Sequence, residues 1–362
     1  MGKICRQQIV YDHQIFLMQQ VGGISRYFCE LASHLSQNSA FDVSVIAPFH
    51  ENRHLKSARS CKVNGNYFAH RFWGANRVRR WGRKLALQCL CWSKDKADIV
   101  HETYYSVNPW GIARYRVLTV YDMIHELFAD DFKHDSYTTI AKHAAVSRAD
   151  HVICISESTR QDLIKLFGVD KQKTSVVHLG FTLNTDETVR PFNLASERPY
   201  LLYVGNRGGY KNFNQLCRVF SSSSINNNFD LVAFGGGAFS LEEFAELTQL
   251  GIANRVHQIS GDDGLLASYY RGAIAFIYPS LYEGFGIPPL EAMSFGCPVA
   301  CSNTSSIPEV VGDAAVFFDP SSEESMRVAI ESLLRSDELR AEMIRRGYAR
   351  GQHFSWAKCA AE

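Results

Sequence analysis

Two glutamates in the C-terminal half of the chain have the type and spacing to bind a sugar. Glu283 and Glu291 form an E-x7-E arrangement in the segment LYEGFGIPPLEAMSFG at 281–296. A buried strand at 273–280 precedes it, so we expect Glu283 in the loop and Glu291 in the first turn of the next helix. Either acid alone is typical of a solvated loop or of a helix start, where it complements the helix dipole. As a pair beside a glycine–proline loop, they indicate binding of vicinal hydroxyls, as on a ribose or a hexose.

The same loop contains residues that let a ligand approach the backbone. Gly284 and Gly286 flank Phe285, and glycine has no Cβ to obstruct a close contact. We therefore include these three residues in the predicted binding site.

Two cations follow the first strand of the C-terminal half. The strand that begins at Tyr200 ends at Gly205, and Arg207 and Lys211 fall in the turn before a helix for which Asn212 is the predicted N-cap. Cations at a helix N-terminus oppose the macrodipole, and an anionic ligand would offset that cost. Phosphate binds helix N-termini, with Arg and Lys as its usual partners. The turn therefore predicts a phosphate site, with a mobile basic loop as the alternative.

The N-terminal half offers two weaker signals. Gly22 and Gly23 precede a helix at 24–35, which fits either a second phosphate-facing turn or an ordinary tight turn. Asp122 and His125 follow a buried strand, and a histidine that titrates near neutrality serves as acid, base or structural hydrogen-bonder. Candidate contacts for an acceptor sugar are His101, Tyr104, Tyr105 and Tyr121.

Several patterns argue against other kinds of site. The segment FGGGAFS at 234–240 lacks the G-x-G-x-x-G spacing of a dinucleotide site, and no G-x-S-x-G motif is present. The acidic doublets 130–131 and 262–263 do not follow a clear strand-to-loop turn. The ten cysteines contain no C-x-x-C pair, which disfavours zinc ribbons and thioredoxin-type sites and favours buried thiols in a reducing compartment. We expect neither a metal nor a cofactor.

The composition is that of a globular protein. Hydrophobic residues make up 46% and charged residues 21% of 362 residues, a length typical of two domains. The net charge of +1 gives no support to nucleic-acid binding. No apolar run approaches the ~18 residues that span a bilayer, and the N-terminus lacks the apolar core of a signal peptide. We expect a cytoplasmic protein.

Short apolar runs alternate with amphipathic helical patterns, which predicts parallel sheets covered by helices. We expect an N-terminal domain at 1–181, a polar linker at 182–199, a C-terminal domain at 200–340 and a helix at 341–362 that packs back on the N-terminal domain. The expected strands lie at 8–12, 41–48, 97–101, 116–122, 149–156, 200–205, 229–235, 255–260, 273–280, 298–302 and 314–320.

One segment is locally basic. Residues 71–84, RFWGANRVRRWGRK, mix cationic with aromatic side chains, and Arg77, Arg80 and Lys84 share helical spacing. Two interpretations stay open: an edge that contacts anionic lipid headgroups, where a lipid-linked acceptor would be presented, or a solvated basic helix.

These motifs resemble the retaining glycosyltransferases of family 4, which have the GT-B fold. The resemblance covers nearly the whole chain and is strongest from Tyr200 to Pro320, around YPSLYEGFGIPPLEAMSFGCPVACSNTSSIPEVVGDAAVFFDP. GGISRYF and the segment SRADHVICISESTRQDLIKLFGV are similar to the mannosyl- and rhamnosyl-transferring branches that build bacterial surface polysaccharides such as O-antigen of lipopolysaccharide. The resemblance implies an α/β architecture of two Rossmann-like parallel-sheet domains that face each other across a cleft.

The resemblance also implies roles for the motif residues. Glu283 would hold the hydroxyls of the donor sugar, and Glu291 the ribose of the nucleotide. Arg207 and Lys211 match the basic pair that neutralises the donor diphosphate, and Gly23 matches a glycine turn near it. Members of the family act without a metal, and retention is usually explained by front-face attack, in which a donor phosphate oxygen takes the acceptor proton.

One departure concerns the acceptor side. Many members have His-Asp where this chain has Tyr121 and Asp122. Either His125 substitutes for the missing histidine, or the sugar contact is made by Tyr121 or by the backbone.

The donor suggested by family analogy is GDP-mannose, and the acceptor a glycan or a lipid-linked oligosaccharide. Other GT-B enzymes, such as a nucleotide-sugar epimerase or a sugar phosphorylase, remain alternatives, as does a non-catalytic sugar-binding scaffold. An NAD-dependent oxidoreductase is disfavoured because the glycine fingerprint is missing.

Overall fold

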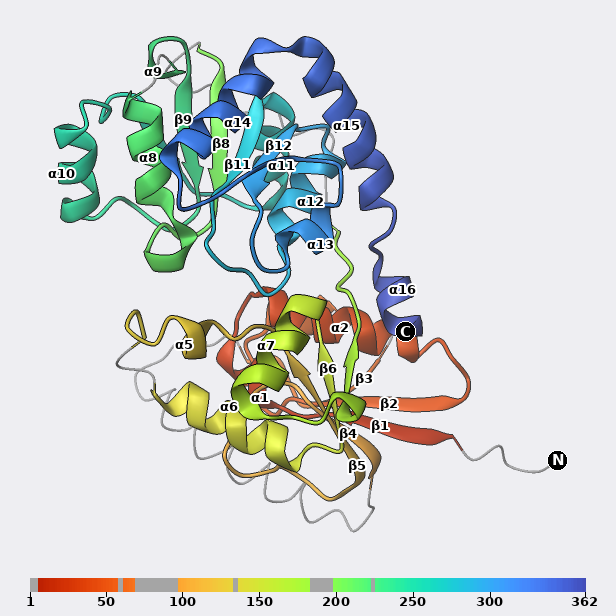
Figure 1. Cartoon of the computed structure of the whole chain (residues 1–362). Helices are drawn as coiled ribbons and strands as arrows, with labels where there is room; N and C mark the ends of the chain where they lie inside the picture. Colours follow the sequence, from red (N-terminus) through yellow and green to blue (C-terminus); the bar gives the residue numbers. More distant parts are fainter. Residues whose placement is uncertain (1–5, 58–60, 69–96, 133–135, 183–197, 223–224) are drawn as a thin grey trace. The chain divides into compact units, whose positions relative to one another are not determined.

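The structure is a computed structural model that describes residues 6–57, 61–68, 97–132, 136–182, 198–222 and 225–362. The chain divides into two compact units, one formed by Met1–Gly180 with Trp356–Glu362 and the other by Phe181–Ser355. Each unit contains one sheet with helices packed on it (Figure 1). The predicted architecture of two α/β units is therefore confirmed.

The first unit contains a seven-stranded sheet in the order β3-β2-β1-β4-β5-β6-β7, in which neighbouring strands run parallel. The strand order reverses between β1 and β4, which is where such sheets bind ligands. The sequence predicted five of these strands but not β3 and β7, which are three residues long. The strands are β1 (Gln7–Tyr11), β2 (Phe41–Ile46), β3 (Lys62–Asn64), β4 (Ala97–Glu102), β5 (Ala113–Val120), β6 (His151–Cys154) and β7 (Thr174–Val176).

The helices of the first unit include the predicted one after Gly22. Its apolar side buries Phe28, Leu31 and Ala32. The helices are α1 (Gln14–Met18), α2 (Gly23–Leu35), α3 (Arg53–Ser57), α5 (Ile124–Leu127), α6 (Ser136–Arg148), α7 (Glu157–Phe167), the 3-10 helix η1 (Lys171–Lys173) and α16 (Trp356–Ala361). In Figure 1, α16 lies against α2, and it buries Trp356 and Cys359. None of the helices in the described ranges is long and apolar enough to cross a bilayer.

The second unit has a six-stranded parallel sheet in the order β10-β9-β8-β11-β12-β13. All six strands were predicted. Here the order reverses between β8 and β11, so residues that follow these two strands meet at the ligand-binding edge. The strands are β8 (Tyr200–Val204), β9 (Asp230–Phe234), β10 (Val256–Ile259), β11 (Ala275–Tyr278), β12 (Val299–Ser302) and β13 (Val316–Phe318).

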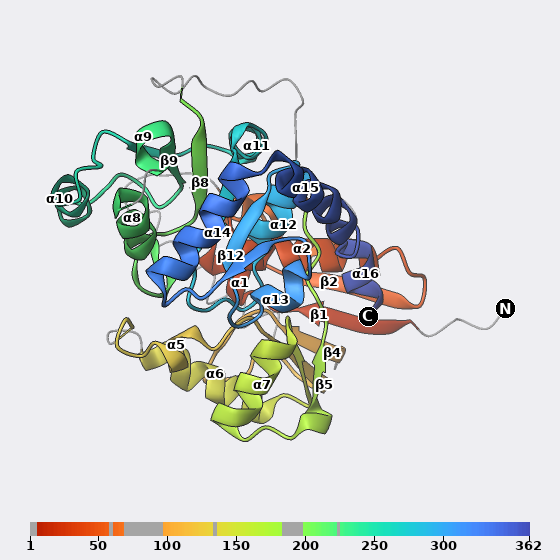
Figure 2. The same cartoon turned by 45° about the horizontal axis from the view of Figure 1, so that its top comes forward.

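The helices of the second unit continue to Gly351, beyond residue 340, where this domain was predicted to end. They are the 3-10 helix η2 (Gly209–Lys211), α8 (Phe213–Ser222), α9 (Ile225–Asn228), α10 (Leu241–Gln249), α11 (Asp263–Gly272), α12 (Ile287–Ser294), α13 (Ile307–Val311), α14 (Glu323–Arg335) and α15 (Asp337–Gly351). Because α15 packs on α12 (Figure 2), the return of the chain to the first unit starts at Trp356 rather than at residue 341.

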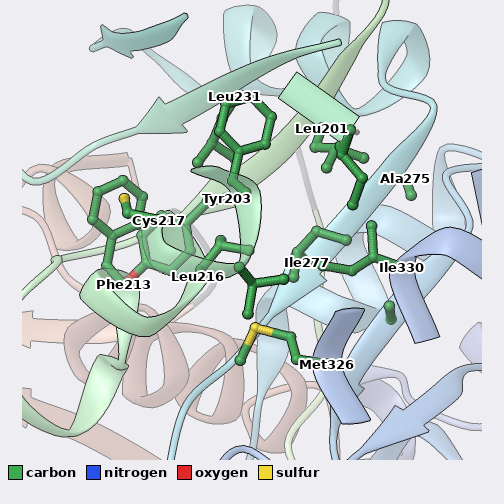
Figure 3. Close-up of a cluster of buried hydrophobic side chains, with 14 of the residues drawn as sticks. Leu201, Tyr203, Phe213, Leu216, Cys217, Leu231, Ala275, Ile277, Met326 and Ile330 are labelled. Atoms are coloured by element: carbon green, nitrogen blue, oxygen red, sulfur yellow. The ribbon is translucent and has the colours of Figure 1, made fainter. Parts of the chain in front are cut away.

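The core of the second unit follows from the alternation of side chains along each strand. Ala275 and Ile277 face a cluster between the sheet and α8 and α14, shown in Figure 3 with Leu201, Phe213 and Met326. Cys217 lies in the same cluster, and all seven cysteines in the part of the chain that the structure describes are free thiols. The sheet is therefore anchored by apolar packing, so the turns at its strand ends are fixed in position.

Candidate functional site

The two predicted turns of the second unit meet at the switch point of its sheet. Lys211 follows β8, Glu283 follows β11, and Lys211 Nζ lies 2.7 Å from Glu283 Oε1. The side chains are 18% and 10% exposed, so the pair is sheltered from water. Lys211 Nζ also lies 5.9 Å from the ring centroid of Tyr278. A cation and an acid are therefore joined at the carboxyl edge of the sheet.

Tyr278 is a part of this site that the sequence did not reveal. Its ring is buried at the end of β11. Burial, together with the neighbouring Glu283 carboxylate, raises the pKa of the Tyr278 phenol well above its usual value. The phenol therefore stays protonated at neutral pH and serves as a hydrogen-bond donor beside Glu283.

The turn after β8 holds the loop at 279–286 from one side. Leu281 N donates to Tyr210 O over 2.8 Å. Asn212 has φ of 59° and accepts the first hydrogen bond of α8 through its carbonyl, from Leu216 N. The side chain of Asn212 was expected to cap α8, but its Nδ2 instead donates to Pro279 O at 3.1 Å and to Pro320 O at 2.9 Å. Asn212 therefore joins the turn at 205–211, where phosphate binding was predicted, to the loop at 279–286 that carries Glu283, called the acidic loop below.

Two serines after β12 hold the acidic loop from the other side. Ser305 Oγ accepts from Glu283 N at 2.9 Å, and Ser306 Oγ lies 2.8 Å from Glu283 O and 2.9 Å from Phe285 O. Ser305 has φ of 52°, a conformation that costs energy for a residue with a Cβ and that persists where the surroundings require it. These serines were not recognised in the sequence.

Glu291 lies one turn deeper in its helix than predicted. Gly286 takes φ of 103° and is the N-cap of α12, which begins at Ile287, so Glu291 lies in the second turn. The reason is that prolines occupy the first positions of the helix, where their lack of an N–H is no disadvantage. The half-buried Glu291 accepts a hydrogen bond from Tyr270 Oη at 3.3 Å. Burial, with a contribution from Glu291, raises the pKa of the Tyr270 phenol.

Arg207 does not extend into open space, as a diphosphate ligand would require. Its guanidinium pairs with Glu243, with Nε 2.7 Å from Oε1 and Nη2 3.1 Å from Oε2. The remaining N–H groups donate to carbonyls of the loop at 235–238. This loop contains the glycines that we discounted as a dinucleotide motif. The sequence predicted a phosphate partner for Arg207, whereas in the structure Glu243 and this loop enclose its guanidinium, which the sequence did not show.

The glycine turn of the first unit is closed by a neighbouring side chain. Gln19 Oε1 accepts from Ser25 N at 3.1 Å, so it caps α2. A Cβ on Gly22 would lie 2.3 Å from Gln19 Oε1, at the end of a flexible side chain that would have to shift, whereas a Cβ on Gly23 would meet nothing within 4 Å. The turn predicted to face phosphate is thus capped by an amide oxygen.

The segment after β5 is fixed by a buried lysine. Lys142 Nζ, in a side chain that is 1% exposed, donates to Glu126 Oε2 at 2.7 Å and to Asp122 O at 3.0 Å. Asp122 Oδ1 accepts from Ile124 N at 3.0 Å, and the carboxylate remains 29% exposed. His125 lies in α5, half-buried. Asp122 therefore lies in the short turn after β5, and His125 lies in the helix that follows it, at the carboxyl edge of the first sheet.

Three of the four candidate acceptor contacts lie in the interior of the first unit. His101 is the penultimate residue of β4, and its Nε2 lies 2.8 Å from Thr119 Oγ1. Burial lowers the pKa of His101 to about 3, so the ring is neutral. Tyr105 and Tyr121 are also buried, with Tyr121 N donating to Tyr105 Oη at 3.3 Å. These three expectations are therefore not supported, and only Tyr104 is partly exposed.

Two further points concern the basic segment and metal ligands. The basic segment at 71–84 lies outside the described residues. Across the ranges that the structure describes, no three His, Cys, Asp or Glu side chains gather closely enough to hold a metal ion.

Each half of the chain matches a glycosyltransferase family model. The profile of the family described as Glycosyltransferase Family 4 matches residues 21–185, and that of Glycosyl transferases group 1 matches residues 184–350. O-antigen chain mannosyltransferase B of Escherichia coli is 29% identical over 240 residues, which cover 62% of each chain. O-antigen chain mannosyltransferase RfbU of Salmonella typhimurium is 27% identical over 255 residues, 69% of this chain and 68% of that one. The chain thus covers about two thirds of these two relatives.

Solved structures share the fold. Sucrose-phosphate synthase from Thermosynechococcus elongatus superposes with a TM-score of 0.73 at 18% identity and covers 98% of this chain and 97% of its own. WaaG, a glycosyltransferase involved in lipopolysaccharide biosynthesis, gives 0.68 at 17% identity, with 98% and 97% covered. Anabaena HepE in complex with UDP-glucose gives 0.70 at 14% identity, with 98% of each chain covered. The two parallel sheets are those of the GT-B class. The chain belongs to glycosyltransferase family 4.

Proposed function

We propose that this protein transfers a hexose from a nucleotide diphosphate sugar to a glycan or lipid-linked acceptor during synthesis of a bacterial surface polysaccharide. The observation that carries the proposal is the Lys211–Glu283 pair at the switch point of the second sheet. A cation beside an acid suits a ligand in which a diphosphate adjoins a sugar. Glu291, in the helix that follows, would hold the ribose of the nucleotide.

The proposed sugar is mannose, supplied as GDP-mannose. The names of the two O-antigen mannosyltransferases from Escherichia coli and Salmonella typhimurium support this choice. HepE, which was solved with UDP-glucose, shares the fold with a different donor, so the fold alone does not select the nucleotide.

The proposed transfer retains the configuration of the anomeric carbon. The bond between that carbon and the diphosphate oxygen breaks with its electron pair on the oxygen, while an acceptor hydroxyl forms the new bond on the same face. The acceptor proton moves to the departing phosphate oxygen, so no enzymic base is required. Because negative charge grows on the leaving group, the Lys211 ammonium stabilises the transition state more than the ground state. Tyr278 and Glu283 orient the sugar.

The acceptor side of the proposal rests on the loop after β5. Asp122 is partly exposed there, and His125 lies three residues further along. We assign these two residues to the acceptor and propose that the reaction needs no metal ion. The segment at 71–84 would bring the protein to an anionic membrane surface on the cytoplasmic side. Liposome co-sedimentation at low salt tests this last part, and absence of binding to anionic vesicles would contradict it.

Release of nucleoside diphosphate tests the function. GDP-mannose is incubated with the purified protein in buffer that contains EDTA, with and without a lipid-linked oligosaccharide extracted from the bacterium that encodes the protein. We expect release only when the acceptor is present, with mannose joined to it in the α-configuration of the donor. Release of mannose 1-phosphate in inorganic phosphate would instead indicate a phosphorylase, and a changed sugar without release would indicate an epimerase. Donor binding with no turnover of any nucleotide sugar would indicate a scaffold.

A further inference from the structure

Arg207 is enclosed by one carboxylate and one loop of the second unit. Its side chain is 3% exposed. Besides the two bonds to Glu243, the guanidinium donates to four consecutive carbonyls, with Nη1 3.0 Å from Gly235 O and 3.1 Å from Gly237 O, and Nη2 3.4 Å from Gly236 O and 3.2 Å from Ala238 O. A guanidinium has five N–H donors. All five are therefore engaged by the protein itself.

The backbone of this loop depends on glycine. Gly235, Gly236 and Gly237 have φ of 92°, 69° and 72°, a conformation that residues with a Cβ rarely adopt. A Cβ on Gly236 would lie 2.6 Å from Nη1 of Arg207 and 3.1 Å from Gly205 O. The loop thus brings its carbonyls to one cation and passes directly beside the end of β8.

The position of the loop links it to the predicted phosphate turn. Gly205 N donates to Phe234 O at 2.9 Å, and Gly235 N donates to Ile259 O at 2.8 Å, so the loop begins at the carboxyl edge of β9. Gly205 starts the turn that carries Lys211. Any ligand bound along this turn therefore borders the loop that Arg207 holds.

The positive charge of Arg207 is already balanced by the carboxylate of Glu243. The carboxylate of Glu243 accepts from it twice, and its Oε2 also accepts from Ser240 N at 2.7 Å in the capping box of α10. Hydrogen bonds from Arg207 lower the pKa of Glu243, which is therefore ionised at neutral pH. A diphosphate that bound Arg207 directly would have to replace this acid as well as the carbonyls.

We propose that Arg207 is a positioning residue that supports nucleotide binding through the loop Gly235–Ala238, and that Lys211 is the cation of this turn that contacts the diphosphate. This inference rests on the proposed function, because it assumes that a nucleotide diphosphate binds along the turn. It assigns a structural partner, Glu243, to a residue that the family resemblance would place on the ligand.

Glu243→Ala separates the two roles because they predict changes of opposite sign. If Arg207 contacts the diphosphate, removal of Glu243 frees the guanidinium and nucleoside diphosphate binds more tightly. If Arg207 acts through the loop, the guanidinium loses the acid that holds it among the carbonyls, the loop is held less firmly, and the Kd of GDP or UDP, whichever the wild type binds more tightly, rises about 10-fold. Ser240→Ala is the matched control: it removes the hydroxyl that caps α10 but keeps the carboxylate on Arg207, and we expect a Kd within about 2-fold of wild type.

Arg207→Lys gives a second test. Lysine keeps the positive charge but lacks the planar fork that reaches four carbonyls and an acid. We expect the Kd to rise about 10-fold, as in Arg207→Met. Near-wild-type affinity in Arg207→Lys, or tighter binding in Glu243→Ala, would overturn the proposal.

Amide hydrogen exchange of the unliganded protein keeps this result separate from the proposed function. In Arg207→Lys, we expect faster exchange within residues 235–239 and unchanged exchange in β11 and β12. Unchanged exchange in the loop would reject the anchoring role even if nucleotide binding were altered. If the wild type bound neither GDP nor UDP, the proposed function would fail, while the exchange result would still decide whether Arg207 anchors the loop.

Discussion

The ammonium of Lys211 and the carboxylate of Glu283 lie 2.7 Å apart, although 72 positions separate them in the sequence. They meet because β8 and β11 are neighbours at the reversal of strand order. A sheltered ion pair is weak support for stability, because desolvation opposes the attraction of the two charges. Its position at the ligand-binding edge favours a role in binding, where a donor would engage the cation with its diphosphate and the acid with its sugar.

Removal of the Lys211 charge should slow transfer. We expect Lys211→Met to lower kcat/KM by about 10²- to 10³-fold, because the leaving diphosphate loses its positive partner in the transition state. Lys211→Arg, which keeps the charge, should lose less. Urea unfolding of Lys211→Met and of the double variant Lys211→Met/Glu283→Gln measures separately how much stability an uncompensated, sheltered acid costs. Near-wild-type kcat/KM in Lys211→Met would exclude the charge-stabilising role.

The two glutamates should affect different kinetic constants. Glu291→Gln weakens a ribose contact that is equal in the ground and transition states, so KM for the donor should rise about 10-fold with little change in kcat. Glu283→Gln should lower kcat, because it perturbs the reacting sugar. Tyr270→Phe, which removes only the phenol bonded to Glu291, provides the control. A fall in kcat with unchanged KM in Glu291→Gln would contradict the ribose assignment.

The hydrogen bonds from Ser306 to the acidic loop should have measurable effects on stability and on kcat. Ser306 Oγ bonds to carbonyls of Glu283 and Phe285, whereas the equally buried Ser302 Oγ donates to Tyr278 O at 3.2 Å within the paired strands. Both alanine substitutions should cost about 1 kcal/mol of unfolding free energy.

Only Ser306→Ala is expected to lower kcat, by about 10-fold, because only Ser306 fixes the loop that carries Glu283. Thermal unfolding and steady-state kinetics of the two variants provide the comparison. Equal kcat values in the two variants would show that the hydrogen bonds of Ser306 contribute to stability alone.

His101 should make the first unit sensitive to acid. Its folded pKa of about 3 lies below the unfolded value of about 6.5, so the unfolded state binds more protons between these values. The stabilising contribution is complete above pH 6.5 and decreases as pH falls toward 3. Between pH 7 and pH 5, wild type should lose about 2 kcal/mol more unfolding free energy than His101→Gln. Urea unfolding at both pH values measures this difference, and equal losses would show that the ring is protonated in the folded protein.

Much of the fold could be predicted because most strands and helices show a local pattern of apolar residues. Every strand of the second sheet except β10 showed an apolar run of three or more residues. β3 and β7 are three residues long and half-exposed, so no period could reveal them. The start of α11 was visible as the doublet at 262–263, but its meaning was not. Asp262 is an N-cap whose Oδ1 accepts from Leu265 N at 2.9 Å.

The candidate site was predicted in position but not in its contacts. That Lys211 and Glu283 follow strands was readable, and parallel strands place such residues at one edge. That they bind each other depends on strand order, which the sequence did not specify. The partner of Arg207 lies 36 positions away, behind a glycine loop with no recognised motif. Ser305 and Ser306 act through backbone hydrogen bonds, which leave no periodic signal.

The central claim is that the donor diphosphate lies along the turn at 205–211 and its sugar at Glu283. A crystal structure with the intact nucleotide sugar that binds most tightly tests this claim most directly. We predict a phosphate oxygen within hydrogen-bond distance of Lys211 Nζ and a sugar hydroxyl within hydrogen-bond distance of the Glu283 carboxylate. A nucleotide sugar bound away from both residues would contradict the account.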